Sequence, residues 1–240
     1  MGPSRLSKTL QGITVTTLAS IGGFFVWTKH CQFSPDDQFN PATEPLFRSQ
    51  WFQKFNPGSN PTTHDECVRR LPLHKIRPEL LEDARNGGSK LVEAFSQGVW
   101  GGFGYKIQRA YLERKYRNDT TTAHQLWTPQ QLRTSTYDVG TEITDHFVVL
   151  EKTPTSILIR CGDSPLNSPD KNRPSDGLFA LTAKADFDKG FAEFRLKSIF
   201  YQGEGEPADK THGPMSSNMQ WLHKLYTKLW MESAMSNVKK

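Results

Sequence analysis

Residues 137–202 decide the fold, and they read YDVGTEITDHFVVLEKTPTSILIRCGDSPLNSPDKNRPSDGLFALTAKADFDKGFAEFRLKSIFYQ. Four runs within this stretch alternate apolar and polar residues, which is the pattern of β-strands with one buried face. The apolar faces consist of Ile143, Phe147 and Val149; Ile157, Ile159 and Cys161; Phe179, Leu181, Ala183 and Phe187; and Ala192, Phe194, Leu196 and Phe200. The stretch therefore predicts four antiparallel strands.

Two short connections join these runs into hairpins. Residues 153–156 (TPTS) link the first pair, and residues 188–190 (DKG) link the second, where Gly190 is free to adopt positive φ. On the fourth run the opposite parity is charged, so we expect that sheet face to meet water. The charged residues are Glu193, Arg195 and Lys197.

The composition describes a soluble body with room for one sizeable core. The 240 residues are 35% hydrophobic, and the formal net charge is +5. The basic residues are spread along the chain, whereas nucleic-acid binding would concentrate them, so we expect no nucleic-acid partner. Cys31, Cys67 and Cys161 are far apart and lack the spacing of metal ligands. We therefore expect no metal site, no disulfide and no cofactor.

The amino terminus has a different character. Residues 9–28 form an uncharged run of 20 residues, preceded by Arg5 and Lys8 and followed by Lys29. Twenty helical residues span about 30 Å, the thickness of a bilayer's hydrocarbon core. We therefore expect residues 1–28 to be a single-pass membrane anchor, with the endoplasmic reticulum as the location. A mitochondrial presequence is the alternative, because the first acidic residue is Asp36 and the segment is rich in Ser and Thr.

Residues 29–63 have the composition of a linker, with repeated Asn-Pro pairs. Within this linker, five apolar residues fall at helical spacing between two prolines, which predicts a short amphipathic helix. This helix either lies on a membrane interface or packs against the domain that follows. The five residues are Leu46, Phe47, Trp51, Phe52 and Phe55.

Residues 64–240 are expected to form the globular domain. A strand over 67–73 would end near Pro72, and helical residues 78–95 would be interrupted at Gly87-Gly88. The glycine-rich run 98–104 follows a helix and not a strand, so we interpret it as a tight passage between helices and not as a phosphate loop.

The next predicted helix, over residues 105–117, is the most basic element of the chain. We expect Ile107, Ala110 and Tyr111 to point inward, and the basic side chains to face either water or anionic lipid. Asn118 begins a glycosylation sequon, which predicts a glycoprotein if this side of the membrane is luminal. A short helix should then start at Thr128, as N-cap, and Pro129.

A long helix closes the chain. Ser217 and Gln220 have the spacing of a capping box. The helix carries a broad apolar stripe, which we expect to cover the inner face of the sheet. The stripe consists of Trp221, Leu222, Leu225, Tyr226, Leu229 and Trp230.

The order strand, helices, antiparallel strands, long carboxy-terminal helix resembles the START-like, polyketide-cyclase-like helix-grip superfamily. The resemblance implies an α+β fold with a curved antiparallel sheet wrapped around the last helix and enclosing a cavity. Shorter phrases also resemble uncharacterised fungal proteins associated with secondary metabolism, namely GVWGG (98–102), VGTEITDH (139–146), RCGDSP (160–165), RPSDG (173–177) and LHKLYTKLW (222–230). Neither resemblance supplies catalytic residues.

Strict alternation points the carboxylates of Asp145 and Asp163 toward the inner face of the sheet. A carboxylate in an apolar cavity could act as a general acid or base, and the alternative is that each caps a turn. Asp176 ends a long loop that could cover the cavity, and it is the third catalytic candidate. We also expect ligand contacts from Tyr226, on the apolar stripe of the last helix. Arg160 and His146 lie on the opposite parity and would reach a ligand through a bulge.

Two classes of function follow. In the first, the protein is a membrane-associated, cofactor-free isomerase, cyclase or dehydratase that acts on a polyketide or terpenoid intermediate. In the second, it is a non-catalytic carrier of a lipid or metabolite. In both, the partners are a hydrophobic small molecule and the membrane.

Overall fold

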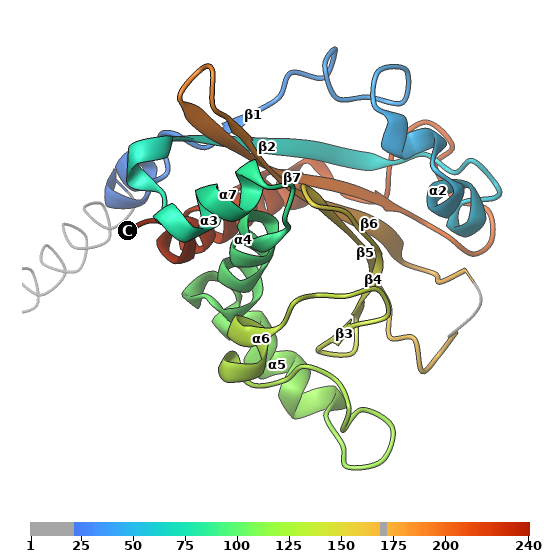
Figure 1. Cartoon of the computed structure of the whole chain (residues 1–240). Coiled ribbons are helices and arrows are strands. Elements are labelled where there is room, and N and C mark those ends of the chain that lie inside the picture. The colour runs from blue at the N-terminus through green and yellow to red at the C-terminus, as the bar shows by residue number, and fades with distance from the viewer. Residues whose placement is uncertain (1–21, 169–171) are drawn as a thin grey trace, which may run out of the picture.

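A computed structural model of the chain describes residues 22–168 and 172–240. Seven strands form one antiparallel sheet in the spatial order β1-β2-β7-β6-β5-β4-β3 (Figure 1). The strands are β1 (Gln32–Phe33), β2 (Thr63–Pro72), β3 (Glu142–Ile143), β4 (Phe147–Lys152), β5 (Ser156–Gly162), β6 (Asp176–Asp186) and β7 (Phe191–Tyr201). The predicted α+β architecture is therefore confirmed, and Pro72 indeed stands at a strand end.

Helices cover one face of this sheet, with α3, α4 and α7 on the same side of it (Figure 1). Helix α4 contacts β5 and β6, whereas α7 contacts α4 and β2, so the two helices share the inner face. The helical elements are η1 (Pro45–Arg48), α2 (Gln50–Phe55), η2 (Leu73–Lys75), α3 (Pro78–Arg85), α4 (Lys90–Gly101), η3 (Phe103–Tyr105), α5 (Lys106–Tyr116), α6 (Pro129–Thr134) and α7 (Ser217–Val238).

The strand faces predicted from alternation are largely confirmed. The core contains buried residues of the predicted parity from β3 to β7, and Phe200 packs against it half-buried. Phe187 lies beyond β6, beneath the guanidinium of Arg85. The hairpin turns are also where we expected them, and Gly190 has a φ of 74°. The buried members are Ile143, Phe147, Val149, Ile157, Ile159, Cys161, Phe179, Leu181, Ala183, Ala192, Phe194 and Leu196.

The opposite face of β7 does not meet water as expected. Glu193, Arg195 and Lys197 are half-buried, because part of the segment before β2 lies over this side of the sheet. Lys197 Nζ lies 2.7 Å from Glu44 Oε2, and Arg195 Nη1 lies 2.8 Å from Glu66 Oε2. The prediction failed because a segment distant in sequence supplies the cover.

The short amphipathic helix takes the second of its two expected positions. Phe47 and Phe55, from η1 and α2, are buried against Leu178, Ile199 and Tyr201 of the outer sheet face. These residues form a second, smaller core. Its burial explains the apolar spacing of this segment without a membrane.

Glycines in the 98–104 run let α4 approach α7 closely. A Cβ on Gly98 would lie 2.6 Å from the carbonyl oxygen of Ala234, and one on Gly104 would lie 3.1 Å from that of Leu229. The run joins α4 to α5 through η3, so it is a passage between helices as expected. Its glycines serve packing between helices.

The buried face of α7 lies later in the helix than predicted. Trp221 and Leu222 are exposed, and Leu225 and Leu229 are half-buried. The N-cap is Ser216, not Ser217, and the side-chain amide of Gln220 donates to the carbonyl of Met215, so the expected capping box is wrong. The core residues of the helix are Trp230, Met231, Ala234, Met235 and Val238.

The orientation of α5 is also the reverse of the prediction. Ile107, Ala110 and Tyr111 point to solvent, and Leu112 is the buried residue of this helix. At α6, by contrast, Thr128 and Gln131 form a complete capping box, which confirms the predicted helix start.

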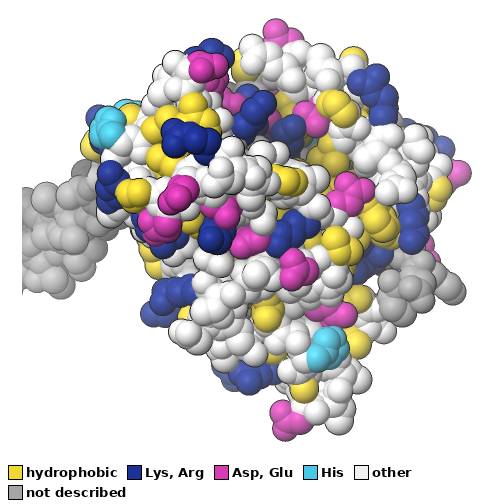
Figure 2. Space-filling view, viewed as in Figure 1, with side chains coloured by type: hydrophobic (Ala, Val, Ile, Leu, Met, Phe, Trp, Pro, Cys, Tyr) yellow, Lys and Arg dark blue, Asp and Glu magenta, His cyan; other side chains and the backbone are white. Residues whose placement is uncertain are grey.

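Charged side chains of both signs are interspersed on the face of the molecule shown in Figure 2.

The expected anchor lies mostly outside the described residues, which include a helical segment over 22–27. Among residues 22–168 and 172–240, no helix combines the length and the hydropathy that crossing a bilayer requires.

Candidate functional site

An apolar cavity of about 330 Å³ lies between the inner face of the sheet and helices α5 and α7. This volume falls within the range of small-molecule sites. Strands β4 to β7 and helix α7 contribute apolar walls, so burial of a hydrophobic ligand here is favourable. The apolar lining includes Phe147, Cys161, Phe179, Leu196, Phe200 and Trp230.

A small set of polar side chains also lines this cavity. They come from four parts of the chain, because the cavity opens where the end of β5, the start of β4, helix α5 and helix α7 meet. The set consists of Gln108, His146, Asp163, His223 and Tyr226.

The first of two His–Asp pairs lies at the start of β4. Nδ1 of His146 is 3.0 Å from Oδ2 of Asp145, whose side chain is fully buried. The imidazole N–H is not aligned for a hydrogen bond, and neither oxygen of Asp145 has a hydrogen-bond partner among the described residues. The edge of the Tyr116 ring packs against the imidazole, with the ring centroids 4.6 Å apart. The imidazole ring therefore lies between the Asp145 carboxylate and the Tyr116 ring.

We predicted that Asp145 points to the inner face of the sheet and His146 to the opposite face. The turn between β3 and β4 reverses these two orientations. Thr144 and Asp145 have φ values of 46° and 70°, so the strict alternation assumed for this stretch breaks here. Asp145 does not enter the apolar cavity; it lines a second cavity, on the other side of the sheet, with Arg160 and Arg173. His146 takes the inward position instead.

The second pair joins β2 to α7. Nε2 of His223 lies 3.3 Å from Oδ2 of Asp65, and the imidazole edge packs against the ring of Phe200 at 5.1 Å. Sequence reasoning missed both residues. A signal existed, because Asp65 shares the parity of Cys67 and Leu71 on β2.

Tyr226 contributes a neutral hydroxyl to the cavity wall. Its hydroxyl donates to Oε1 of Gln108 over 3.0 Å, and both residues line the cavity. Burial raises the pKa of Tyr226 to about 12, so the phenol keeps its proton at neutral pH. It remains a hydrogen-bond donor for a ligand that displaces Gln108.

The other two carboxylate candidates differ in position. Asp163 lines the apolar cavity, but its Oδ2 already accepts the backbone N–H of Ser175 at 3.0 Å. It therefore combines the expected turn cap with a place at the cavity wall.

Asp176 lines neither of these two cavities, because it forms a buried ion pair. Its Oδ1 and Oδ2 accept Nε and Nη2 of Arg160 at 3.0 and 2.6 Å. The Arg160 guanidinium also lies 3.6 Å from the ring centroid of Phe55. These contacts lie under the outer face of the sheet and tie α2 to β5 and β6.

Two imidazoles, each beside a carboxylate, and one neutral phenol are suited to moving protons at a bound apolar molecule. Cys161 adds only apolar wall, since burial raises the pKa of its thiol and keeps it protonated.

Comparison of the chain with protein families, with curated proteins and with solved structures finds no match.

Proposed function

We propose that this protein binds a hydrophobic small molecule in the apolar cavity and catalyses a cofactor-free proton transfer on it, as an isomerase, cyclase or dehydratase. The observation that supports this proposal is that two histidines, His146 and His223, line one apolar cavity and that each has an aspartate carboxylate beside it. A carrier of the same ligand needs a single orienting group, whereas proton-transfer catalysis needs an acid and a base at the reacting atoms.

In the proposed reaction, the imidazole of His146 takes a proton from carbon next to a carbonyl group of the substrate. The C–H electron pair moves toward the carbonyl oxygen, where the hydroxyl of Tyr226 donates a hydrogen bond to the developing negative charge. The carboxylate of Asp145 stabilises the imidazolium that forms. His223 gives a proton to the substrate, to carbon in an isomerisation or to a hydroxyl that leaves as water in a dehydration. His146 then releases its proton to water and His223 takes one from water, so that both return to their starting states.

We propose a polyketide or terpenoid intermediate as the substrate class, since such molecules combine apolar carbon skeletons with activated C–H bonds. The helix-grip resemblance also stays a proposal. Its support is that α7 packs with α4 over the inner face of the sheet and that α7 lines the apolar cavity. Membrane association through residues 1–28 belongs to the same proposal.

The test uses metabolites that accumulate in the source organism when the gene is deleted. The purified full-length protein is incubated with that extract in D₂O, and mass spectrometry follows each compound. We expect one compound to gain deuterium or to lose water with wild-type protein, and the reaction to be lost in His146→Gln and His223→Gln. The matched control is His212→Gln, because His212 is exposed, contacts Asp209 and does not line the cavity.

Three outcomes contradict the proposal. If no compound changes, the protein does not catalyse proton transfer on that pool. If a compound co-purifies unchanged with the wild-type protein, the carrier function is correct. If His146→Gln and His223→Gln both react as fast as His212→Gln, the two pairs have no part in the chemistry.

A further inference from the structure

Helix α5 and η3 present an apolar stripe to solvent. Phe103, Ile107 and Tyr111 recur every four residues, and their exposed fractions are 54, 84 and 60%. The stripe continues onto the amino-terminal segment, because the ring of Trp27 packs against that of Phe103 with centroids 5.7 Å apart. We call Trp27, Phe103, Ile107 and Tyr111 the α5 patch. Of these four, Ile107 and Tyr111 are residues that the sequence analysis expected to point inward.

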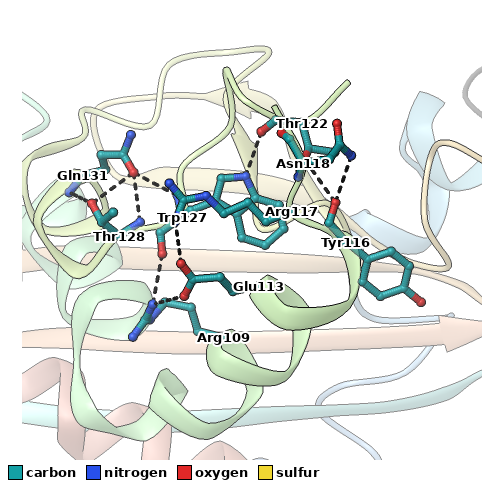
Figure 3. A network of polar contacts seen from close by, with 9 residues as sticks. All are labelled: Arg109, Glu113, Tyr116, Arg117, Asn118, Thr122, Trp127, Thr128 and Gln131. Carbon is teal, nitrogen blue, oxygen red and sulfur yellow. Dashed lines mark hydrogen bonds and ion pairs between the residues drawn. The ribbon is translucent and has the colours of Figure 1, made fainter. Parts of the chain in front are cut away.

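The opposite side of α5 is firmly attached to the protein, so the patch cannot turn inward. Arg109 donates to the backbone carbonyl of Trp127, outside the helix, at 3.2 Å, and to the carboxylate of Glu113 on the same helix at 2.9 Å (Figure 3). The indole of Trp127 donates in turn to the carbonyl of Thr122, and Leu112 is buried on the same side of the helix. Exposure of the patch is therefore a property of the folded state.

The surroundings of the patch are strongly basic. Residues 22–33 and 103–116 contain a single acidic side chain, Glu113. That acid is neutralised by Arg109 and by Arg117, at 2.9 and 2.6 Å. Apart from Arg109, which lies on the attached side of α5, the Lys and Arg residues of these two segments are Lys29, Lys106, Arg114 and Lys115.

The sequence that leads up to Trp27 carries no charged residue from Thr9 onward. The uncharged run over residues 9–28 ends at Trp27 and Thr28, one residue before Lys29. An apolar surface with aromatic residues, a basic rim and an adjoining uncharged segment matches a bilayer surface that carries anionic lipid.

From these observations we infer that the α5 patch is a docking surface for an anionic lipid bilayer. Gln108 lies on the same helix and lines the apolar cavity, so docking would place the cavity next to the membrane. A hydrophobic molecule dissolved in the bilayer would then reach the cavity without crossing bulk water. The docking surface does not depend on the proposed reaction, and its test therefore measures no turnover.

The experiment places a nitroxide spin label on the full-length protein by Ile107→Cys. The native cysteines, Cys31, Cys67 and Cys161, are buried and would remain unlabelled. Val139→Cys is the matched control, because Val139 is an exposed aliphatic residue in the turn before β3. Collision rates with oxygen, which partitions into lipid, and with a water-soluble nickel chelate are measured with vesicles of phosphatidylcholine containing phosphatidylserine.

We expect the label at residue 107 to gain collisions with oxygen and to lose those with nickel several-fold when vesicles are added, while the label at residue 139 does not change. The shift should weaken when phosphatidylserine is omitted or salt is raised, since the basic rim acts by charge. If both labels respond equally in vesicle-bound protein, or if the protein does not bind vesicles, the inference is wrong. If the label at 107 is shielded without vesicles and more so at higher protein concentration, a second copy of the chain covers the patch instead.

Discussion

Nδ1 of His146 lies 3.0 Å from Oδ2 of Asp145, yet these two neighbours line cavities on opposite sides of the sheet. The left-handed backbone at Thr144 and Asp145 makes this possible, because it turns one side chain outward and the next inward. The carboxylate therefore contacts the imidazole without occupying space in the apolar cavity. A substrate would meet His146, and Asp145 would act through it.

This relationship predicts different consequences for two Asp→Asn changes. Asn tolerates the left-handed conformation, so Asp145→Asn should keep the fold but remove the charge beside His146. We expect turnover to fall by about 10²-fold, the lower range for a general base. Asp163→Asn should retain most activity, because an amide oxygen can still accept the N–H of Ser175. Deuterium exchange rates and thermal melts of both variants provide the check, and equal rates would remove Asp145 from the mechanism.

Asp176 is predicted to matter for stability. Its pair with Arg160 is buried, with both side chains almost inaccessible to solvent. Asp176→Ala leaves a buried guanidinium without its carboxylate, and we expect a loss of about 3–5 kcal/mol in the free energy of unfolding. Urea denaturation measures this loss. Glu206→Ala, which breaks an exposed pair with Lys210, should leave the unfolding curve unchanged. Similar curves for the two variants would contradict the structural role of Asp176.

The late position of the buried face on α7 can be tested by truncating two of its side chains. Met235 is fully buried, so Met235→Ala should cost about 2–5 kcal/mol of unfolding free energy. Leu222 is exposed, and Leu222→Ala should change it by less than about 0.5 kcal/mol. Chemical denaturation distinguishes the two. If Leu222→Ala lowered the free energy of unfolding more than Met235→Ala, the buried face of α7 would be the one predicted from the sequence.

His64 is predicted to make stability depend on pH. Burial lowers its pKa from the ordinary value of 6.5, and its ring packs between Phe39 and Phe47. The unfolded chain therefore binds the proton more readily than the folded one. Its contribution to stability is fully present above pH 6.5 and is lost as pH falls through the folded-state pKa. His64→Phe keeps an aromatic ring and should remove this part of the acid destabilisation. Melting temperatures of wild type and His64→Phe between pH 5 and pH 7.5 test this prediction. It would be refuted if the melting temperature depended on pH equally steeply in the two proteins.

Several parts of the architecture follow from local sequence. The alternation in β5, β6 and β7 identifies their inner faces, because a strand that packs against helices must present every second residue to the core. Gly190 and the Thr128–Gln131 capping box are equally local, since each depends on residues within one turn.

The candidate site depended on tertiary structure. Asp65 and His223 are separated by 158 positions, and only the packing of α7 against β2 brings them together. Likewise, apolar periodicity defined a stripe on α5 but not whether it is buried, because that depends on which side of the helix Arg109 and Leu112 attach to the protein. The sequence by itself determined strands β4 to β7, their inner faces and the two hairpin turns, since these rest on interactions between near neighbours. The tertiary structure decided which residues meet in the cavity and which apolar surface stays exposed, because these depend on contacts between distant segments.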